Sequence, residues 1–193
     1  IKDTGDGKVE LFAIYHSEDG DFVVNKLRAH LLRRLANAVQ QHVPQLDRSL
    51  QEDAAEHVNQ VNTIHDELRK TIESVIADVD QSIRMSMSDR DDGSATATIA
   101  IVTEAAIVTV SVGSGQVVGY DDSSSIIPLT NYYDDRQTRN VFGAKKSRRT
   151  SACRPHVEIF HRGGIQLLTL KSPTVATNIR DYDLFRIVLS EFN

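Results

Sequence analysis

The sequence predicts an α+β fold in which helices pack on a mainly antiparallel sheet. The apolar residues first favour a strand, then follow a helical repeat through two long stretches, and finally return to short strand-like runs. Helices and strands therefore do not alternate along the chain as they do in parallel α/β folds. The 193 residues, of which 40% are hydrophobic, suffice for one compact core, so we expect a single domain over residues 1–193.

The first predicted elements are a strand and an amphipathic helix. Residues 9–15 form a short apolar run with strand propensity. The polar residues from His16 to Asp21 predict a turn. From Phe22 onward, leucines recur at helical spacing with basic residues between them, which predicts an amphipathic helix that ends near Pro44.

A second helical repeat extends from about residue 56 to residue 87, with no Gly or Pro between residues 50 and 87. Its apolar stripe fits either a coiled coil or packing on the sheet. If both helices pack on the sheet, the side chains that we expect them to bury are Leu27, Leu31, Leu35, Leu68, Ile72 and Val75.

The composition changes after residue 93. Residues 95–112 are rich in Thr, Ile, Val and Ala and predict two strands joined by a turn at Glu104-Ala105. Residues 116–120 predict a third strand that continues an antiparallel meander. Further strand-like runs occupy residues 157–160, 165–170 and 184–189.

Charge and cysteine content restrict the function class. The net charge of −5 gives no global attraction to nucleic acid or an anionic membrane, and no run approaches the ~20 apolar residues of a membrane span. The single Cys153 cannot form an internal disulfide, and it predicts a reducing, intracellular compartment without distinguishing the cytoplasm from an organelle. Because the chain begins with Ile1 and ends directly after an apolar run, we expect it to be part of a longer gene product.

Five short motifs follow one another along the chain. They are LFAIYHSEDG at 11–20, DGSATA at 92–97, VGSGQ at 112–116, PLT at 128–130 and DLFRIVLSE at 183–191. In this order they resemble the D-G-H-G-G turn with its preceding strand, and the G-S-T-A, V-G-D-S-R, P-L-T and D-E-F-L-I-L-A-S-D segments, of the metal-dependent Ser/Thr phosphatases of type 2C, the PPM family. The resemblance covers most of the chain. It implies a sandwich of mainly antiparallel sheets that continues beyond this chain, with two long helices packed on a sheet rather than in a coiled coil.

The resemblance also implies a two-metal site, and this chain departs from it. The family holds two divalent cations with aspartates, because hard cations prefer anionic oxygen ligands. The cations activate a bridging water and clamp the phosphate. The family's phosphate-binding arginine and its late D-N motif have no counterpart here. The residues at the other site positions are His16 for the bridging aspartate, Ser17 for a glycine, Ser114 and Gln116 for the aspartate and arginine of V-G-D-S-R, and Glu191 for a late aspartate.

Loss of the bridging aspartate together with the arginine predicts a catalytically inactive protein. A neutral imidazole supplies no anionic charge between two dications and favours softer metals. We therefore expect no catalytic residues and no cofactor, and a role as scaffold, regulator or assembly subunit that binds other proteins. The alternative is an atypical phosphoprotein phosphatase with Mg²⁺ or Mn²⁺ in a rearranged site, whose ligands would be His16, Glu18, Asp19 and Glu191.

Residues 121–156 are predicted to be an irregular, flexible loop. This segment contains a basic run, formed by Lys145, Lys146, Arg148 and Arg149. Such a run is usually solvated, but it could also contact RNA phosphates or an acidic protein surface. Because no aromatic residues are interleaved, base stacking is not supported.

Overall fold

The computed structural model describes residues 8–51, 58–88, 93–123, 125–130, 140–143 and 153–178. Three features predicted from the sequence lie outside the described residues. These are the strand at 184–189, Glu191 within the last motif, and the basic run at 145–149.

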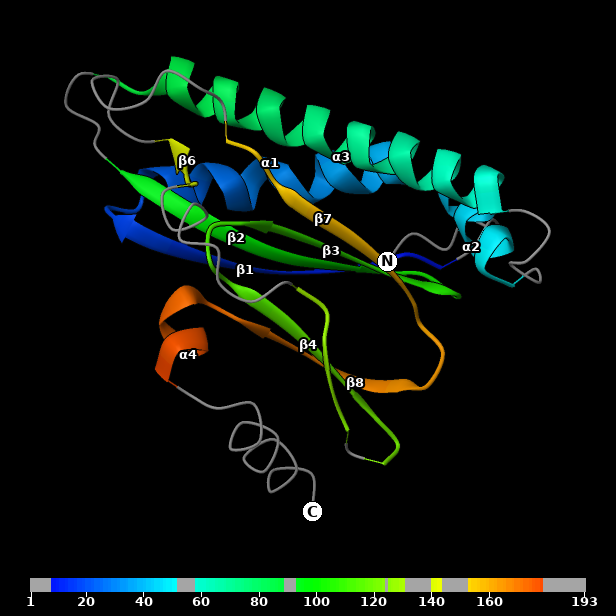
Figure 1. Ribbon diagram of the computed structural model, residues 1–193. Helices are drawn as coiled ribbons and strands as arrows, with labels where there is room; N and C mark the ends of the chain where they lie inside the picture. Colours follow the sequence, from blue (N-terminus) through cyan, green and yellow to red (C-terminus); the bar gives the residue numbers. More distant parts are fainter. Residues whose placement is uncertain are drawn as a thin grey trace.

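The described residues form two antiparallel sheets and a helix layer (Figure 1). Sheet A has the order β1-β2-β3-β7, and β6 also pairs with β2. Its strands are β1 (Glu10–Asp19), β2 (Ser94–Val102), β3 (Ala106–Val112), β6 (Phe142–Gly143) and β7 (His156–His161). Sheet B has the order β5-β4-β8, formed by β4 (Gln116–Asp121), β5 (Ile126–Pro128) and β8 (Ile165–Lys171). The predicted α+β class with mainly antiparallel sheets is confirmed.

The helix layer covers one face of sheet A, and sheet B lies on the other side (Figure 1). The helices of this layer are α1 (Phe22–Val39), α2 (Val43–Gln51) and α3 (Val58–Ser86), and the short α4 (Pro173–Asn178) follows β8 on the side of sheet B. The prediction that the first helix ends near Pro44 is wrong, because α1 ends at Val39 and Pro44 lies in the first turn of α2. Proline is tolerated there, since the N–H that it lacks has no partner in the first turn of a helix. Among the described residues, no helix is both long and apolar enough to cross a membrane.

The main core lies between α1, α3 and sheet A. The leucines predicted on the two helices and Ile72 are all buried in it, as are Val79 and Ile83. Val75 is only partly buried at the margin of this core, and Ile76 is fully buried instead. The buried positions 68, 72, 76, 79 and 83 keep a helical repeat of three or four residues along one face.

Strand β1 is longer than the sequence predicted. His16 and Ser17 were expected in a polar turn, but they pair with Thr96 and Ala95 of β2, and the pairing resumes at Asp19 after a bulge. Pairing satisfies the backbone groups of these polar residues, so it overrides their weak strand propensity. The turn before α1 is thereby shortened to Gly20 and Asp21. Gly20 has a φ of 64°, and its carbonyl oxygen accepts a hydrogen bond from the Ser17 hydroxyl.

Strand β4 does not continue the meander that the sequence predicted. β2 and β3 form the expected hairpin, but β4 pairs with β5 and β8 in sheet B. The chain leaves sheet A at Gly113, whose φ is 98°. It then passes so close to β2 that a Cβ on Gly113 would lie 2.4 Å from Thr96 Cγ2, and a Cβ on Gly115 1.8 Å from Thr98 Oγ1. Only glycines allow this crossing from one sheet to the other.

The described part of residues 121–156 contains two short strands, although the sequence predicted an irregular segment. β5 pairs with β4, and β6 pairs with the start of β2. Both strands are very short, and one contains Pro128 and the other Gly143. Strand propensity is low for these residue types, so long-range pairing decides the structure here.

Candidate functional site

The face of sheet A that looks toward sheet B is more polar than the face under the helices. On β2, Ala95, Ala97, Ile99 and Ile101 belong to the core with α1 and α3. Successive side chains of a strand point to opposite faces, so Thr96 and Thr98 look toward sheet B. The apolar cluster on that side is small, and its fully buried members are Ala100, Ile107, Val117 and Leu129.

The residues at two of the family's site positions come together at one end of this polar face. His16, which is half-buried, is the cross-strand partner of Thr96 and lies on the same face. The turn Gly113-Ser114-Gly115 lies directly against Thr96 and Thr98, as the close approach of its glycines shows. The structure therefore brings His16 and Ser114 to the same end of the sandwich, on either side of Thr96.

Gln116 lies on a different face. Its neighbour Val117 points between the sheets, so alternation along β4 places Gln116 on the outer side of sheet B. The side chain is only 4% exposed, and its Oε1 atom is buried without a hydrogen-bond partner. Its partner across the strands is Lys171, which is 1% exposed. Gln116 therefore does not share a surface with His16.

The described side chains at this end of the sandwich do not fit a two-metal centre. His16, Ser17, Thr96 and Ser114 carry no carboxylate, and the Ser17 hydroxyl is donated to the Gly20 carbonyl oxygen. Hard divalent cations need several anionic oxygen ligands. In the part of the chain that the structure describes, no group of three or more His, Cys, Asp or Glu residues could hold a metal ion. The side chains of Glu18, Asp19 and Glu191 lie outside this description.

Sequence reasoning missed a histidine and a glutamate on the polar face of β7. His156 pairs with Ser111 of β3, and its Nε2 atom lies 2.9 Å from Oε1 of Glu158. Phe160 belongs to the cluster between the sheets, so Glu158 and His156 share its face. This pair is an ion pair only when the imidazole is protonated. The signal in the sequence was the alternation of polar and apolar residues from His156 to Phe160.

Asp80 is a second residue that the sequence analysis missed. It is fully buried in α3. Its Oδ1 accepts a hydrogen bond from the Gly143 N–H at 2.9 Å, and its Oδ2 accepts one from the Cys153 N–H at 3.0 Å and pairs with Arg84. Asp80 thus fixes residues 143 and 153 beside each other, at the two ends of the segment that contains the basic run. The sequence signal for this role was an aspartate on the apolar stripe of the helix, next to Val79 and four residues before Arg84.

A further pair of hydrogen bonds holds the same two chain segments together. The Arg154 N–H donates to Asn140 Oδ1 at 3.0 Å, and the Asn140 amide donates back to the Arg154 carbonyl oxygen. The side-chain amide of Asn140 thereby makes the two hydrogen bonds to Arg154 that the backbone of a neighbouring strand would make. Residues 140–143 and 153–154 are thus held to each other by Asn140 and to α3 by Asp80.

Comparisons with known proteins give a match at the level of fold. No protein-family model matches the sequence, and a search of curated proteins finds no match. The solved structure of serine-threonine phosphatase 2C from Toxoplasma gondii is similar with a TM-score of 0.71 at 10% identity, and the match covers 98% of this chain and 75% of that one. A sex determining protein of C. elegans gives a TM-score of 0.64 at 12% identity, with 93% of this chain and 47% of that chain covered.

A bacterial phosphatase is also similar. Serine/threonine phosphatase Stp1 from Staphylococcus aureus gives a TM-score of 0.50 at 14% identity, and the match covers 94% of this chain and 74% of that one. At such identities the likeness concerns the fold and not the site. The chain has the fold of the type 2C, or PPM, serine/threonine phosphatases, as the order of its motifs predicted.

Proposed function

We propose that this chain is a catalytically inactive protein with the type 2C phosphatase fold, which acts by binding other proteins as a scaffold, regulator or assembly subunit. The observation that carries the proposal is the set of side chains around Thr96. By the resemblance of the motifs, His16 and Ser114 correspond to positions at which the family has aspartates, and hard divalent cations require such carboxylates. No cofactor is part of this proposal.

Two properties of these side chains disfavour the two-metal phosphate hydrolysis of the family. The imidazole of His16 can bind one soft or borderline metal through a single nitrogen, but it cannot bridge two hard dications as a carboxylate does. Without the two cations, nothing in this group of residues activates water or clamps phosphate oxygens. Gln116, which takes the place of an arginine, is neutral and faces the outer side of sheet B.

The partner and the compartment are also proposals. We propose protein partners within a larger intracellular assembly, consistent with the buried Cys153, which is not part of a disulfide. The basic run formed by Lys145, Lys146, Arg148 and Arg149 is proposed as one further contact region. Gly143 and Cys153, which flank the segment that contains it, are both hydrogen-bonded to Asp80. RNA phosphates are the alternative ligand of that run, and loss of the crosslinked partner on nuclease treatment would indicate RNA, whereas its persistence would indicate a protein.

A phosphatase assay with metal titration tests the proposal. We expect no turnover of p-nitrophenyl phosphate or of a phosphopeptide with Mn²⁺ or Mg²⁺, and no two-site Mn²⁺ binding in calorimetry. The Toxoplasma gondii phosphatase serves as the positive control. Turnover that is abolished by a chelator and by Glu191→Ala would establish the alternative, a phosphatase with a rearranged metal site. Recovery of stable partner proteins with the native chain would support the binding role.

A further inference from the structure

Helix α1 carries an uncompensated positive charge. It contains Lys26, Arg28, Arg33 and Arg34, together with His30, and no Asp or Glu between Phe22 and Val39, although the whole chain has a net charge of −5. The ion pairs found among the described residues join other elements, such as Arg69 with Asp66 and Arg84 with Asp80. An excess of one charge on one helix of an acidic protein attracts a partner of the opposite charge.

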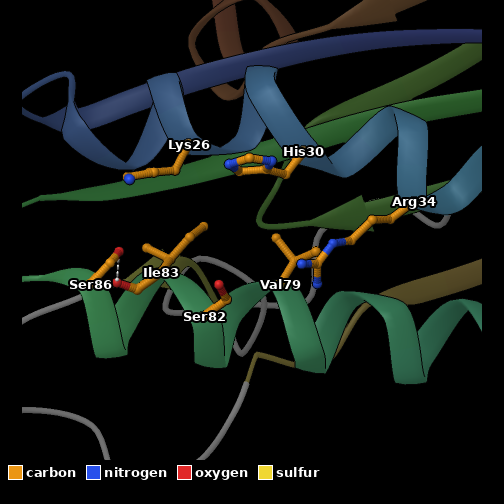
Figure 2. Close-up of a pocket in the computed structure, with 7 residues that line it drawn as sticks. All are labelled: Lys26, His30, Arg34, Val79, Ser82, Ile83 and Ser86. Atoms are coloured by element: carbon orange, nitrogen blue, oxygen red, sulfur yellow. Dashed lines mark hydrogen bonds between the residues drawn. The ribbon is translucent and has the colours of Figure 1, made fainter.

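Part of this charge lines a groove between α1 and α3 (Figure 2). Lys26, His30 and Arg34 follow one another at intervals of four residues and therefore lie on one face of α1. The side of α3 that faces them contributes Val79 and Ile83, which form an apolar floor, and Ser82 and Ser86. The Ser86 hydroxyl donates to the Ile83 carbonyl oxygen at 2.8 Å, whereas the structure assigns Ser82 no hydrogen bond within the described part of the chain.

The acidic residues of α3 do not neutralise the groove. Asp80 is turned away toward Gly143 and Cys153 and is paired with Arg84. Asp78 is exposed one turn before Ser82, and it is not among the residues that line the groove. No described residue that lines the groove is acidic, so the three basic side chains face a wall of apolar and hydroxyl-bearing side chains there.

The size of the groove and the spacing of its charges indicate the ligand. Its volume of about 60 Å³ has room for roughly four waters and is far below the several hundred Å³ of a nucleotide or cofactor pocket. Figure 2 shows the basic side chains spread along α1, with Lys26 opposite Ser86 and Arg34 beside Val79. Four helical residues advance about 6 Å, and alternate side chains of an extended chain are spaced by nearly the same length, about 6.6 Å.

We propose that this groove binds an extended acidic segment of a partner protein, whose Asp or Glu residues at alternate positions face Lys26, His30 and Arg34. The Ser82 hydroxyl can donate to a carboxylate or to the peptide backbone. A single phosphate fits less well, because the three basic side chains are arranged in a row and do not converge on one point. The groove lies in the helix layer, across sheet A from the Gly113-Ser114-Gly115 turn, so this proposal is independent of whether the polar face is catalytic.

Fluorescence anisotropy with two labelled peptides tests the proposal on the full chain. One peptide has Glu at alternate positions separated by Gly and Ser, and the other has Gln in place of each Glu. We expect the Glu peptide to bind at low ionic strength and to dissociate as salt is added, and the Gln peptide not to bind. Lys26→Gln and Arg34→Gln should each weaken binding about two- to fivefold, the range for one exposed ion pair.

Arg28→Gln is the matched control, because it removes the same charge from α1 at a position that does not line the groove. We expect it to leave the affinity nearly unchanged, and thermal melting should show that all three variants fold. Equal binding of both peptides, or an equal loss in Arg28→Gln and Arg34→Gln, would overturn the proposal. Displacement of the Glu peptide by low concentrations of inorganic phosphate or of a single-stranded oligonucleotide would also overturn it. A chain that turns over phosphopeptides but binds the Glu peptide would contradict only the proposed function.

Discussion

The two faces of sheet A differ in what they bury, and β2 shows the difference within a single strand. The side chains of Ala95, Ala97, Ile99 and Ile101 pack under α1 and α3, whereas Thr96 and Thr98 look toward sheet B. Among the described residues, the helix side forms one large apolar cluster, and the fully buried apolar residues between the sheets are few. The hydroxyl groups on the second face need hydrogen bonds, such as that from Thr109 Oγ1 to the Leu129 carbonyl oxygen at 2.8 Å.

Under the proposed function, this difference explains how the fold can persist while the residues of the site change. A buried Leu or Ile side chain contributes about 1.5–3 kcal/mol, and most such side chains lie on the helix side of sheet A. The end of the polar face, where His16 and Ser114 lie, contributes little apolar burial. Replacement of metal ligands there therefore removes chemistry without removing the main source of stability. Four predictions test this division, from the largest expected effect to the smallest.

Asp80→Ala should give the largest loss of stability. The substitution leaves the Gly143 and Cys153 N–H groups buried without their acceptor, and it leaves Arg84 without its partner. Breaking a buried ion pair of this kind costs about 3–5 kcal/mol in the free energy of unfolding, which urea denaturation measures. Asp78→Ala, two residues earlier and exposed, is the control and should change stability by less than about 0.5 kcal/mol. Equal effects of the two substitutions would show that Asp80 is not a structural clamp.

Leu31→Ala and Leu168→Ala compare the two sides of sheet A directly. Leu31 is fully buried under the helices, and its truncation should lower the free energy of unfolding by about 2–5 kcal/mol. Leu168 is only partly buried against the cluster between the sheets, so its truncation should cost less. Urea denaturation of both variants under the same conditions is the measurement. If Leu168→Ala destabilises the chain more than Leu31→Ala, the space between the sheets is the main core.

The helix side was also the part that the sequence predicted well. The stripe of Leu68, Ile72, Val79 and Ile83 arises from local periodicity, because residues three and four apart share a face. The prediction that Val75 is buried was wrong by one position, because Ile76 continues the buried repeat equally well. The order of the five motifs also predicted the sandwich, because in this order they resemble segments of the type 2C phosphatases.

The second sheet depends on pairing between distant residues, which local patterns do not encode. The strand at Gln116 looked like the next member of a meander, and its pairing with Lys171 of β8 cannot be inferred from neighbouring residues. The same holds for the extension of β1 through His16, which depends on Thr96. For the site, the correspondence of individual residues to the family's positions stays a prediction from the motifs. The sequence did not predict that Gln116 faces away from His16.

Gln116→Leu should leave the stability unchanged or raise it by up to about 1 kcal/mol. The buried Oε1 of Gln116 has no hydrogen-bond partner, so an apolar side chain of similar volume removes a cost of burial. Gln116→Ala is the control, and it should be destabilising because it leaves a cavity. Urea denaturation compares the three proteins. A clear loss of stability in Gln116→Leu would show that the amide of Gln116 is needed in the outer layer of sheet B.

The smallest effect concerns Tyr15, which lies on the helix side of β1 and has a buried hydroxyl group without a hydrogen-bond partner. Burial raises the pKa of Tyr15 to about 12, and the nearby Arg28 offsets part of this rise. An unfolded tyrosine ionises near pH 10, as in model peptides. The folded state thus keeps a proton that the unfolded state loses, so the stability that Tyr15 contributes is complete below about pH 10 and declines as the pH rises toward 12. Tyr15→Phe should remove this part of the decline, and it should remove a tyrosine that ionises near pH 12 from the tyrosinate absorbance curve. Urea denaturation at several alkaline pH values gives the first result, and the absorbance titration gives the second. Identical pH dependence of the two proteins would show that the Tyr15 hydroxyl is solvated, and that the helix side of sheet A is more open at β1 than the buried leucines of α1 indicate.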